Sequence, residues 1–292
     1  MPNLKEVRNR ITSVNSTKQI TSAMKMVAAA KLKRAQDAIT QMRPYAEKLS
    51  EILGNVSASL DVSENAYAEE REVKKVLIVG VTSNRGLCGS FNAQINKKID
   101  KFIKNELKDV HVDVVTVGKK AQDYFRKQQL LLEEGGSIPQ ESNDIFDNLE
   151  FGVVSELAEK IMDAFLNGEY DKVYIGYNQF KNAATQVSTI EQFLPVVTPE
   201  TDEASSEYIF EPNKKDILDE MIPKSLKTQL FKAILDSNAS EHGARMTAMH
   251  QATENATDLL KELKLSYNKA RQAAITKEIL EITSGAEALA AD

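Results

Sequence analysis

The sequence predicts an α/β protein: a long antiparallel coiled coil of N- and C-terminal helices, with a central Rossmann-like α/β domain. The first observation is that no glycine precedes Gly54 and no proline follows Pro223, while nine of the 12 glycines lie between Gly80 and Gly176. Glycine and proline mark turns, so segments without them favour uninterrupted helices. The second is that apolar residues at both ends recur in steps of three and four, whereas the middle holds short valine-rich runs. The expected domains are residues 1–57, 74–210 and 213–292.

The N-terminal segment is predicted to be helical from about Asn3 to Ser57. Its apolar positions follow the heptad rhythm of a coiled coil. They are Leu4, Val7, Ile11, Val14, Ala28, Leu32, Ala35, Ile39, Met42, Ala46, Leu49, Leu53 and Val56. Pro44 interrupts this run, which predicts a local bend.

The C-terminal segment is predicted to be helical from about Pro223 to Leu289, with Pro223 suited to the first helical position. Its apolar residues form one stripe from Met246 to Ala274 and a second, on a shifted face, from Ile275 to Leu289. At about 1.5 Å per residue, the two terminal helices would span on the order of 80 and 100 Å. Such helices need their apolar stripes covered, so we expect each to cover the other.

The middle alternates between predicted strands and helices, which favours a mostly parallel sheet covered by helices. The strands expected are Lys74 to Ser83, those starting at His111 and Lys172, and Thr185 to Phe193. The helices expected are Ser90 to Leu107, Gly118 to Gln128 and Leu149 to Leu166. The polar, acidic stretches Ser57 to Glu72 and Thr198 to Glu207 are typical of linkers.

Charge is unevenly distributed, with a net charge of −6 overall but nine basic residues against Glu6 and Asp37 in residues 1–43. This pattern indicates either a basic surface that meets an acidic partner or a solvated helix face. Nucleic acid is a weaker candidate because the whole chain is acidic. The single cysteine excludes an internal disulfide, and no run approaches the roughly 18 apolar residues of a membrane span. Direct membrane insertion is therefore not expected, and a protein working at a membrane would need a partner to hold it there.

The residues Ser83 to Asn92, SNRGLCGSFN, form the most distinctive local motif, since they follow a predicted strand and open a predicted helix. A phosphate could bind there, but the motif lacks both the Gly-Lys-Ser/Thr ending of a P-loop and the GxGxxG spacing. Cys88 lies in this loop, and the few histidines offer it no evident base. His242 and His250 are too far apart along one helix to share a metal ion. No catalytic residue, metal site or cofactor is predicted, and the motif is interpreted as a tight turn with a docking surface.

Arg271 and Gln272 are adjacent polar residues on the apolar C-terminal helix. Together they could make several directional hydrogen bonds to carboxylates or backbone groups of a partner, or they could simply face solvent.

Three separated blocks resemble the gamma subunits of F-type ATP synthases. They are RNRITSVNSTKQITSAMKMVAAAKLKRAQ near the N-terminus, SNRGLCGSFN, and SEHGARMTAMHQATENA followed by NKARQAAITKEILEITSGAEAL. In the last block, residues 275–278, Glu281 and residues 285–286 match a family signature of Ile-Thr-x-Glu, an acid and a late Gly-Ala. Asn84 and Ser90 depart from the family pattern, which has Asp and Gly, so a role that needs a carboxylate at position 84 is not expected here.

The resemblance implies a rotor axle inside a ring of three alpha and three beta subunits, attached with epsilon to a membrane c-ring. It places Arg271 and Gln272 against a beta loop, and Arg245, Met24 and Lys25 near an acidic lever of beta. It places Cys88 in the globular foot. The apolar end, with Ile279 and Ile282, is expected to turn in a sleeve.

The function expected from this resemblance is to couple proton flow to ATP synthesis or hydrolysis on beta and to regulate ATPase activity. The chain itself would not be catalytic. Its expected location is the cytoplasmic side of a cell or inner membrane, as a peripheral subunit. The alternatives are an α/β nucleotide-binding enzyme with helical arms and a passive coiled-coil scaffold.

Overall fold

The computed structural model describes residues 4–58, 66–133, 135–196 and 214–290. The chain divides into two compact units, one made of residues 1–27 and 246–292 and the other of residues 28–245. The predicted linker Thr198 to Glu207 lies outside the described residues, as does much of Ser57 to Glu72.

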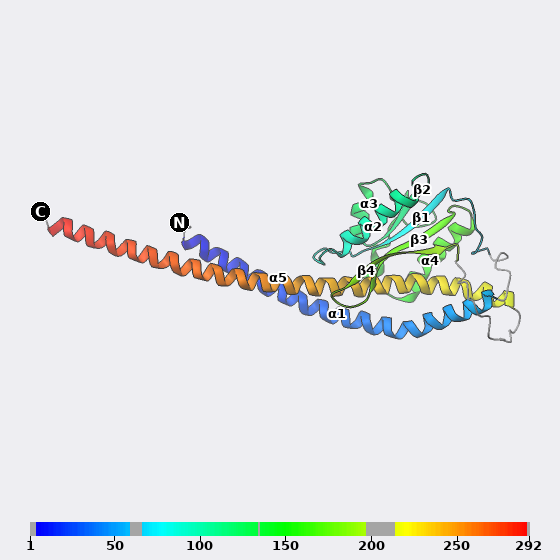
Figure 1. The fold of residues 1–292 in the computed structure, drawn as a ribbon, viewed down its shortest axis with the longest axis horizontal. Helices are drawn as coiled ribbons and strands as arrows, with labels where there is room; N and C mark the ends of the chain where they lie inside the picture. Colours follow the sequence, from blue (N-terminus) through cyan, green and yellow to red (C-terminus); the bar gives the residue numbers. More distant parts are fainter. Residues whose placement is uncertain (1–3, 59–65, 134, 197–213, 291–292) are drawn as a thin grey trace. The chain divides into compact units, whose positions relative to one another are not determined.

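Two long helices, α1 (Leu4–Ala58) and α5 (Lys214–Ala290), begin and end the described chain, as the sequence predicts (Figure 1). Helix α1 continues through Pro44. The light blue part of this helix is curved in Figure 1. Pro223, in contrast, does not begin helix α5, because the helix starts at Lys214 and Pro223 lies inside it. The prediction was wrong because it weighed proline's local preference alone, whereas the buried residues Ile222, Leu226 and Leu230 hold this turn against the core.

The sheet has the strand order β2-β1-β3-β4. Its strands are β1 (Lys75–Val81), β2 (His111–Val117), β3 (Lys172–Phe180) and β4 (Gln186–Leu194). Strand β1 pairs in parallel with β2 and β3, while β4 pairs antiparallel with β3 at one edge. The central strand β1 is buried from Val76 onward, which explains its continuous apolar run. All four predicted strands are confirmed.

Helices cover both faces of the sheet, in two separate apolar clusters. Helices α2 (Phe91–Glu106) and α3 (Lys119–Arg126) pack on the face that carries Val76 and Ile78. Helix α4 (Phe151–Leu166) and the Ile222–Ile234 part of α5 pack on the face that carries Leu77 and Val79. The odd and even residues of β1 thus point to opposite layers, as the two-residue strand period requires. A short 3₁₀ helix, η2 (Asn143–Phe146), precedes α4.

Within the larger unit, α1 contributes a buried stripe of Ala28, Leu32, Ala35, Ile39 and Leu49, which are predicted heptad positions. Residues of α1 and α5 line one small cavity together, Ile39, Met42, Arg43 and Ala46 from the first helix and Lys232, Leu235 and Asp236 from the second. The two helices therefore pack against each other in this unit.

Within the smaller unit, the two helices are antiparallel. The hydroxyl groups of Thr21 and Thr253 lie 2.8 Å apart, and Lys25 Nζ lies 3.3 Å from His250 Nδ1. Residue numbers thus increase along α1 in the direction in which they decrease along α5, as in an antiparallel pair. Buried Val7, Met249, Ala256 and Leu260 complete the seam. The predicted coiled coil is confirmed here by direct contacts.

Candidate partner-binding surfaces

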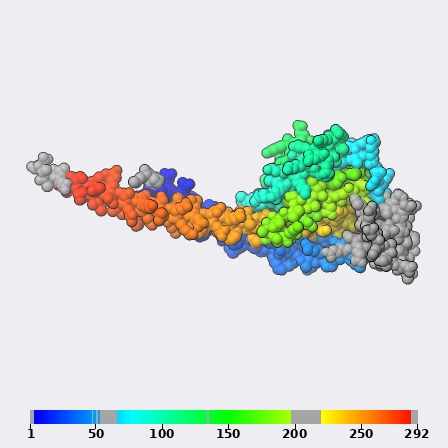
Figure 2. Space-filling model, in the orientation of Figure 1, coloured from blue at the N-terminus to red at the C-terminus, as the bar shows by residue number. Residues whose placement is uncertain are grey.

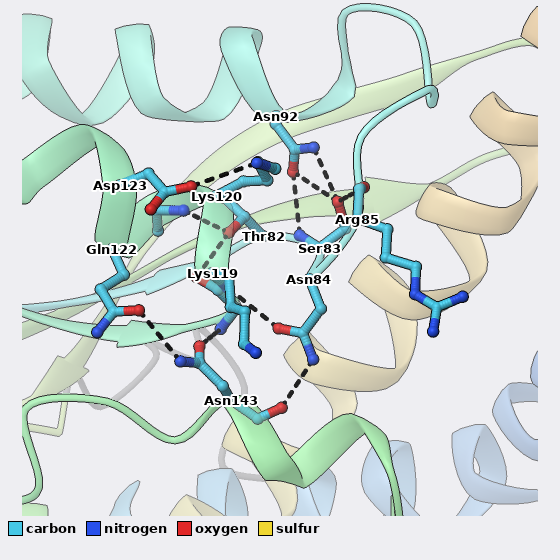
Figure 3. Close-up of polar contacts among 12 residues, drawn as sticks. Thr82, Ser83, Asn84, Arg85, Asn92, Lys119, Lys120, Gln122, Asp123 and Asn143 are labelled. Carbon is cyan, nitrogen blue, oxygen red and sulfur yellow. Dashed lines mark hydrogen bonds and ion pairs between the residues drawn. The ribbon is translucent and has the colours of Figure 1, made fainter.

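The loop after β1, Ser83 to Ser90, lies at the carboxyl end of the parallel strands, where open α/β sheets usually bind ligands. Figure 3 shows it beside the start of α3 and residue Asn143 of η2. Asn92 ties the loop to α2, since its side-chain oxygen accepts from Ser83 N (3.0 Å) and from Ser83 Oγ (3.1 Å). The loop is therefore an ordered part of the domain.

The backbone amides that open α3 are all engaged within the chain (Figure 3). Four consecutive N–H groups donate to protein oxygens: Gly118 to Asn143 Oδ1, Lys119 to Asn84 Oδ1, Lys120 to Ser83 O and Ala121 to Thr82 Oγ1. These are the donors that a phosphate would use at a helix N-terminus. The arrangement favours a structural role for this edge of the sheet over anion binding.

Asn84, one of the two departures from the family pattern, works as both donor and acceptor. Its Nδ2 donates to Asn143 O at 2.9 Å, while its Oδ1 accepts from Lys119 N at 3.1 Å. An aspartate could accept the second bond but could not, when ionised, donate the first. The amide thus joins three segments of the domain.

Cys88 is 1% exposed beneath the loop. Asn92 Nδ2 lies 3.2 Å from its sulfur, and burial raises the pKa of the thiol above its ordinary value. The neighbouring Leu87, in contrast, is 66% exposed and has a positive φ of 63°. Of the two side chains, only that of Leu87 is exposed to solvent. A partner that bound this loop, as predicted for Cys88, would therefore contact Leu87 and not the thiol.

Arg245, a predicted partner contact, bonds within the chain. It forms an ion pair with Glu241 one turn earlier on α5, and donates to the carbonyl oxygens of Arg85 and Gly86. Its neighbour His242 is buried, which lowers the pKa of that imidazole to about 4.

The remaining predicted contacts belong to the smaller unit. Met24 and Lys25 are half-buried beside the seam. Arg271 and Gln272 are exposed, and Ile279 and Ile282 are 55% and 65% exposed. The antiparallel register set by Thr21 and Thr253 brings Leu4, the first described residue of α1, opposite about Ala270. These four residues therefore lie beyond the stretch of α5 that pairs with the described part of α1. Figure 2 shows the orange-red surface of this end of α5 uncovered in the view drawn.

Sequence reasoning missed a buried polar run on α5, from Asp236 to His242. Asp236 Oδ1, Ser237 Oγ and His242 Nδ1 have no hydrogen-bond partner in the part of the chain that is described. The available signal was the break in apolar spacing between Leu235 and Met246, where DSNASEHGAR offers small and polar residues instead.

Comparison with known proteins gives matches along almost the whole chain. A family model described as ATP synthase matches residues 3–289. ATP synthase gamma chains of Christiangramia forsetii and Flavobacterium johnsoniae are 58% and 59% identical over 291 and 292 residues, with 99% of each chain covered. The chain belongs to the ATP synthase gamma chain family.

Solved structures share the fold of this gamma-family chain. A central stalk and c-ring structure of the Tetrahymena thermophila mitochondrial ATP synthase has a TM-score of 0.58 at 24% identity, covering 80% of this chain and 99% of that one. A rotor structure of the Euglena gracilis enzyme has a TM-score of 0.61 at 18% identity, covering 93% and 98%. The family match, over residues 3–289, spans both terminal helices and the α/β domain.

The described part of this gamma-family chain contains no group of three or more His, Cys, Asp or Glu side chains that could hold a metal ion. Nor does any helix among the described residues have the length and apolar character needed to cross a membrane.

Proposed function

We propose that the chain is the central rotor shaft of an F-type ATP synthase, coupling proton flow through the membrane sector to ATP synthesis or hydrolysis on beta. The observation that carries this is the free end of α5, beyond the stretch paired with α1. Ile275, Ile279, Leu280 and Ile282 there are 49% to 65% exposed. An apolar helix surface of this kind favours a protein partner that encloses it.

The proposed mechanism is a population shift. Three like catalytic subunits have no reason of their own to occupy three different states. The free end of α5 is not symmetric about its axis, because it carries Arg271 and Gln272 on one part and isoleucines along its length. It therefore presents a different surface to each catalytic subunit. Because a ligand shifts an equilibrium only through different affinities for the states, turning this end changes which subunit is favoured. Protons would supply about 2.3 kcal/mol per charge per 100 mV.

The chain needs stiffness and surface for this role, rather than chemistry of its own. Its proposed partners are three alpha and three beta subunits, the epsilon subunit and the c-ring. We assign it no catalytic residue, and regulation of ATPase activity would act through its contacts. Its proposed location is the cytoplasmic side of a cell or inner membrane, as a peripheral subunit held by those partners.

The experiment that tests the proposal is affinity purification of the full chain from its own cells under gentle conditions. Alpha and beta chains with P-loops should co-purify in equal amounts, in about three copies each for one copy of this chain. Tight ATP binding by the chain alone, with no such partners, would instead favour a nucleotide-binding enzyme. Self-association into rods alone would favour a passive scaffold.

A further inference from the structure

One side chain of α5 holds the loop after β1. Arg245 Nη2 donates to Arg85 O at 3.0 Å and to Gly86 O at 3.2 Å. Its Nη1 pairs with a carboxylate oxygen of Glu241. The side chains of Arg245 and Glu241 are only 12% and 11% exposed, so the pair is shielded from solvent. Charge-assisted bonds in such surroundings are stronger than those at a surface.

The loop held in this way contains a strained turn. Leu87 and Gly89 have φ values of 63° and 61°, a backbone region that a leucine adopts only at a cost of about 1 kcal/mol or more. The Leu87 side chain is 66% exposed and therefore gains little from burial. Contacts other than the packing of Leu87 must stabilise the turn, and Arg245 holds the two carbonyls immediately before it.

Cys88 lies under the same turn. Its sulfur is 3.2 Å from Asn92 Nδ2 and 3.8 Å from Ser83 Oγ, and the residue is 1% exposed. A reagent in solution can reach the thiol only if the turn lifts. The reactivity of Cys88 is therefore a direct measure of how often the turn opens.

We infer that Arg245 and Glu241 form a latch that fixes the turn Arg85–Gly89 to helix α5. The latch keeps the Cys88 thiol buried and the Leu87 side chain exposed to solvent. The latch rests on contacts within the chain and does not depend on the proposed function. It has a consequence for binding, because a partner carboxylate that reached Arg245 would have to compete with Glu241 and two backbone carbonyls. Capture of Arg245 by a partner would release the turn, so the two events are thermodynamically linked.

The test measures the rate at which the full 292-residue chain reacts with a disulfide reagent such as DTNB. Cys88 is its only cysteine, so there is no background reaction. Arg245→Ala should accelerate labelling by about tenfold or more, because the turn loses both of its bonds to α5. The exposed α5 variant Lys261→Ala, which removes a cation elsewhere, should react at the rate of the original chain.

Charge and geometry are separated by Arg245→Lys, which keeps the positive charge but loses the planar fork. Burial raises the pKa of Cys88, and the Arg245 charge acts in the opposite direction. A purely electrostatic role predicts slower labelling in Arg245→Ala and little change in Arg245→Lys. The latch predicts faster labelling in both.

Folding is checked by circular dichroism and by the urea midpoint. Should Arg245→Ala fail to fold, Arg245→Lys decides the matter. Faster labelling in a folded lysine variant supports the latch, while an unchanged or slower rate overturns it.

Discussion

At the scale of single residues, Gly118 has little freedom to accept a side chain. It links β2 to α3 with a φ of 114°, and a Cβ atom built there would collide with the backbone carbonyl of Thr82. Thr82 in turn accepts the amide of Ala121 and donates to Gly118 O. The glycine is required by both its backbone conformation and the close approach of another strand end.

We therefore expect Gly118→Ala to lower the free energy of unfolding by about 3 kcal/mol or more. Urea denaturation followed by circular dichroism measures the change. Gly86→Ala is the matched control, since Gly86 has an ordinary φ and no atom within 4 Å of the added carbon. Equal urea midpoints for the two variants would contradict the steric constraint at Gly118.

Asp236 is one residue whose charge should make the free energy of unfolding depend on pH. It is 2% exposed, and one of its oxygens lacks a partner. Burial raises its pKa from 3.8 to about 6, although Lys232 of α5 and Arg43 of α1 act against that rise, while Glu191 of β4 adds to it. Because the folded-state pKa is raised, the buried charge destabilises the fold above pH 6, and this cost disappears as pH falls through 6 towards 3.8.

Asp236→Asn should accordingly be more stable than the original chain at pH 8, by about 1 kcal/mol or more, and the difference should shrink by pH 5. The lowered pKa of His242 affects stability in the opposite direction over an overlapping range, so the comparison must be between the two proteins at each pH. Urea titrations at pH 8, 7, 6 and 5 provide it. A gap that does not change with pH would contradict the assignment.

At the scale of elements, helix α5 contains a proline as its tenth residue. Pro223 cannot donate a backbone hydrogen bond to the carbonyl four residues earlier, and its ring crowds that carbonyl. The helix nonetheless runs from Lys214 because Ile222, Leu226 and Leu230 are buried in the core on its inner face. Tertiary packing here overrides a local preference.

Replacing the proline should release that conflict. We expect Pro223→Ala to raise the free energy of unfolding by about 1 kcal/mol or more, since the helix gains one bond and loses the clash. Urea denaturation tests this. A lower midpoint would mean that the rigidity of proline in the unfolded chain matters more than its effect on the helix.

The polar pair Arg271 and Gln272 belongs to the same helix but lies beyond the part that pairs with the described residues of α1. Under the proposed function, Arg271→Ala combined with Gln272→Ala should reduce ATP turnover of the assembled complex by about tenfold, through loss of directional bonds to beta. Because both residues are exposed, helicity of the free chain should not change. Reduced helicity by circular dichroism would show that they serve the fold instead.

At the scale of the whole molecule, the chain combines a unit with a large core and a unit whose apolar residues remain partly exposed. The sheet and its helices bury two extensive clusters in the larger unit. The far end of α5 leaves isoleucines half-exposed in the smaller one. This contrast is expected of a subunit whose second unit completes its burial against other chains.

Ile279→Asp tests that expectation. A carboxylate on the free end of α5 should weaken association with alpha and beta, by about 2 kcal/mol or more, because the charge would have to be desolvated. Recovery of the complex by affinity purification measures it, with exposed Lys277→Ala as the control. Normal assembly and unchanged ATP hydrolysis would count against a close-fitting sleeve around this end.

The sequence by itself determined the two long helices, the four strands, their covering helices and the family. These features depend on periodic spacing and on local motifs such as Ser83 to Asn92. Both signals come from residues that are close together in the sequence. Tertiary structure decided where Pro223 lies, that Cys88 faces inward, and that Arg245 binds Arg85 and Gly86. It also decided that Asp236 is buried without a full set of partners. The physical reason is that these properties depend on groups distant in sequence: a contact between residues 160 positions apart leaves no periodic trace in either segment.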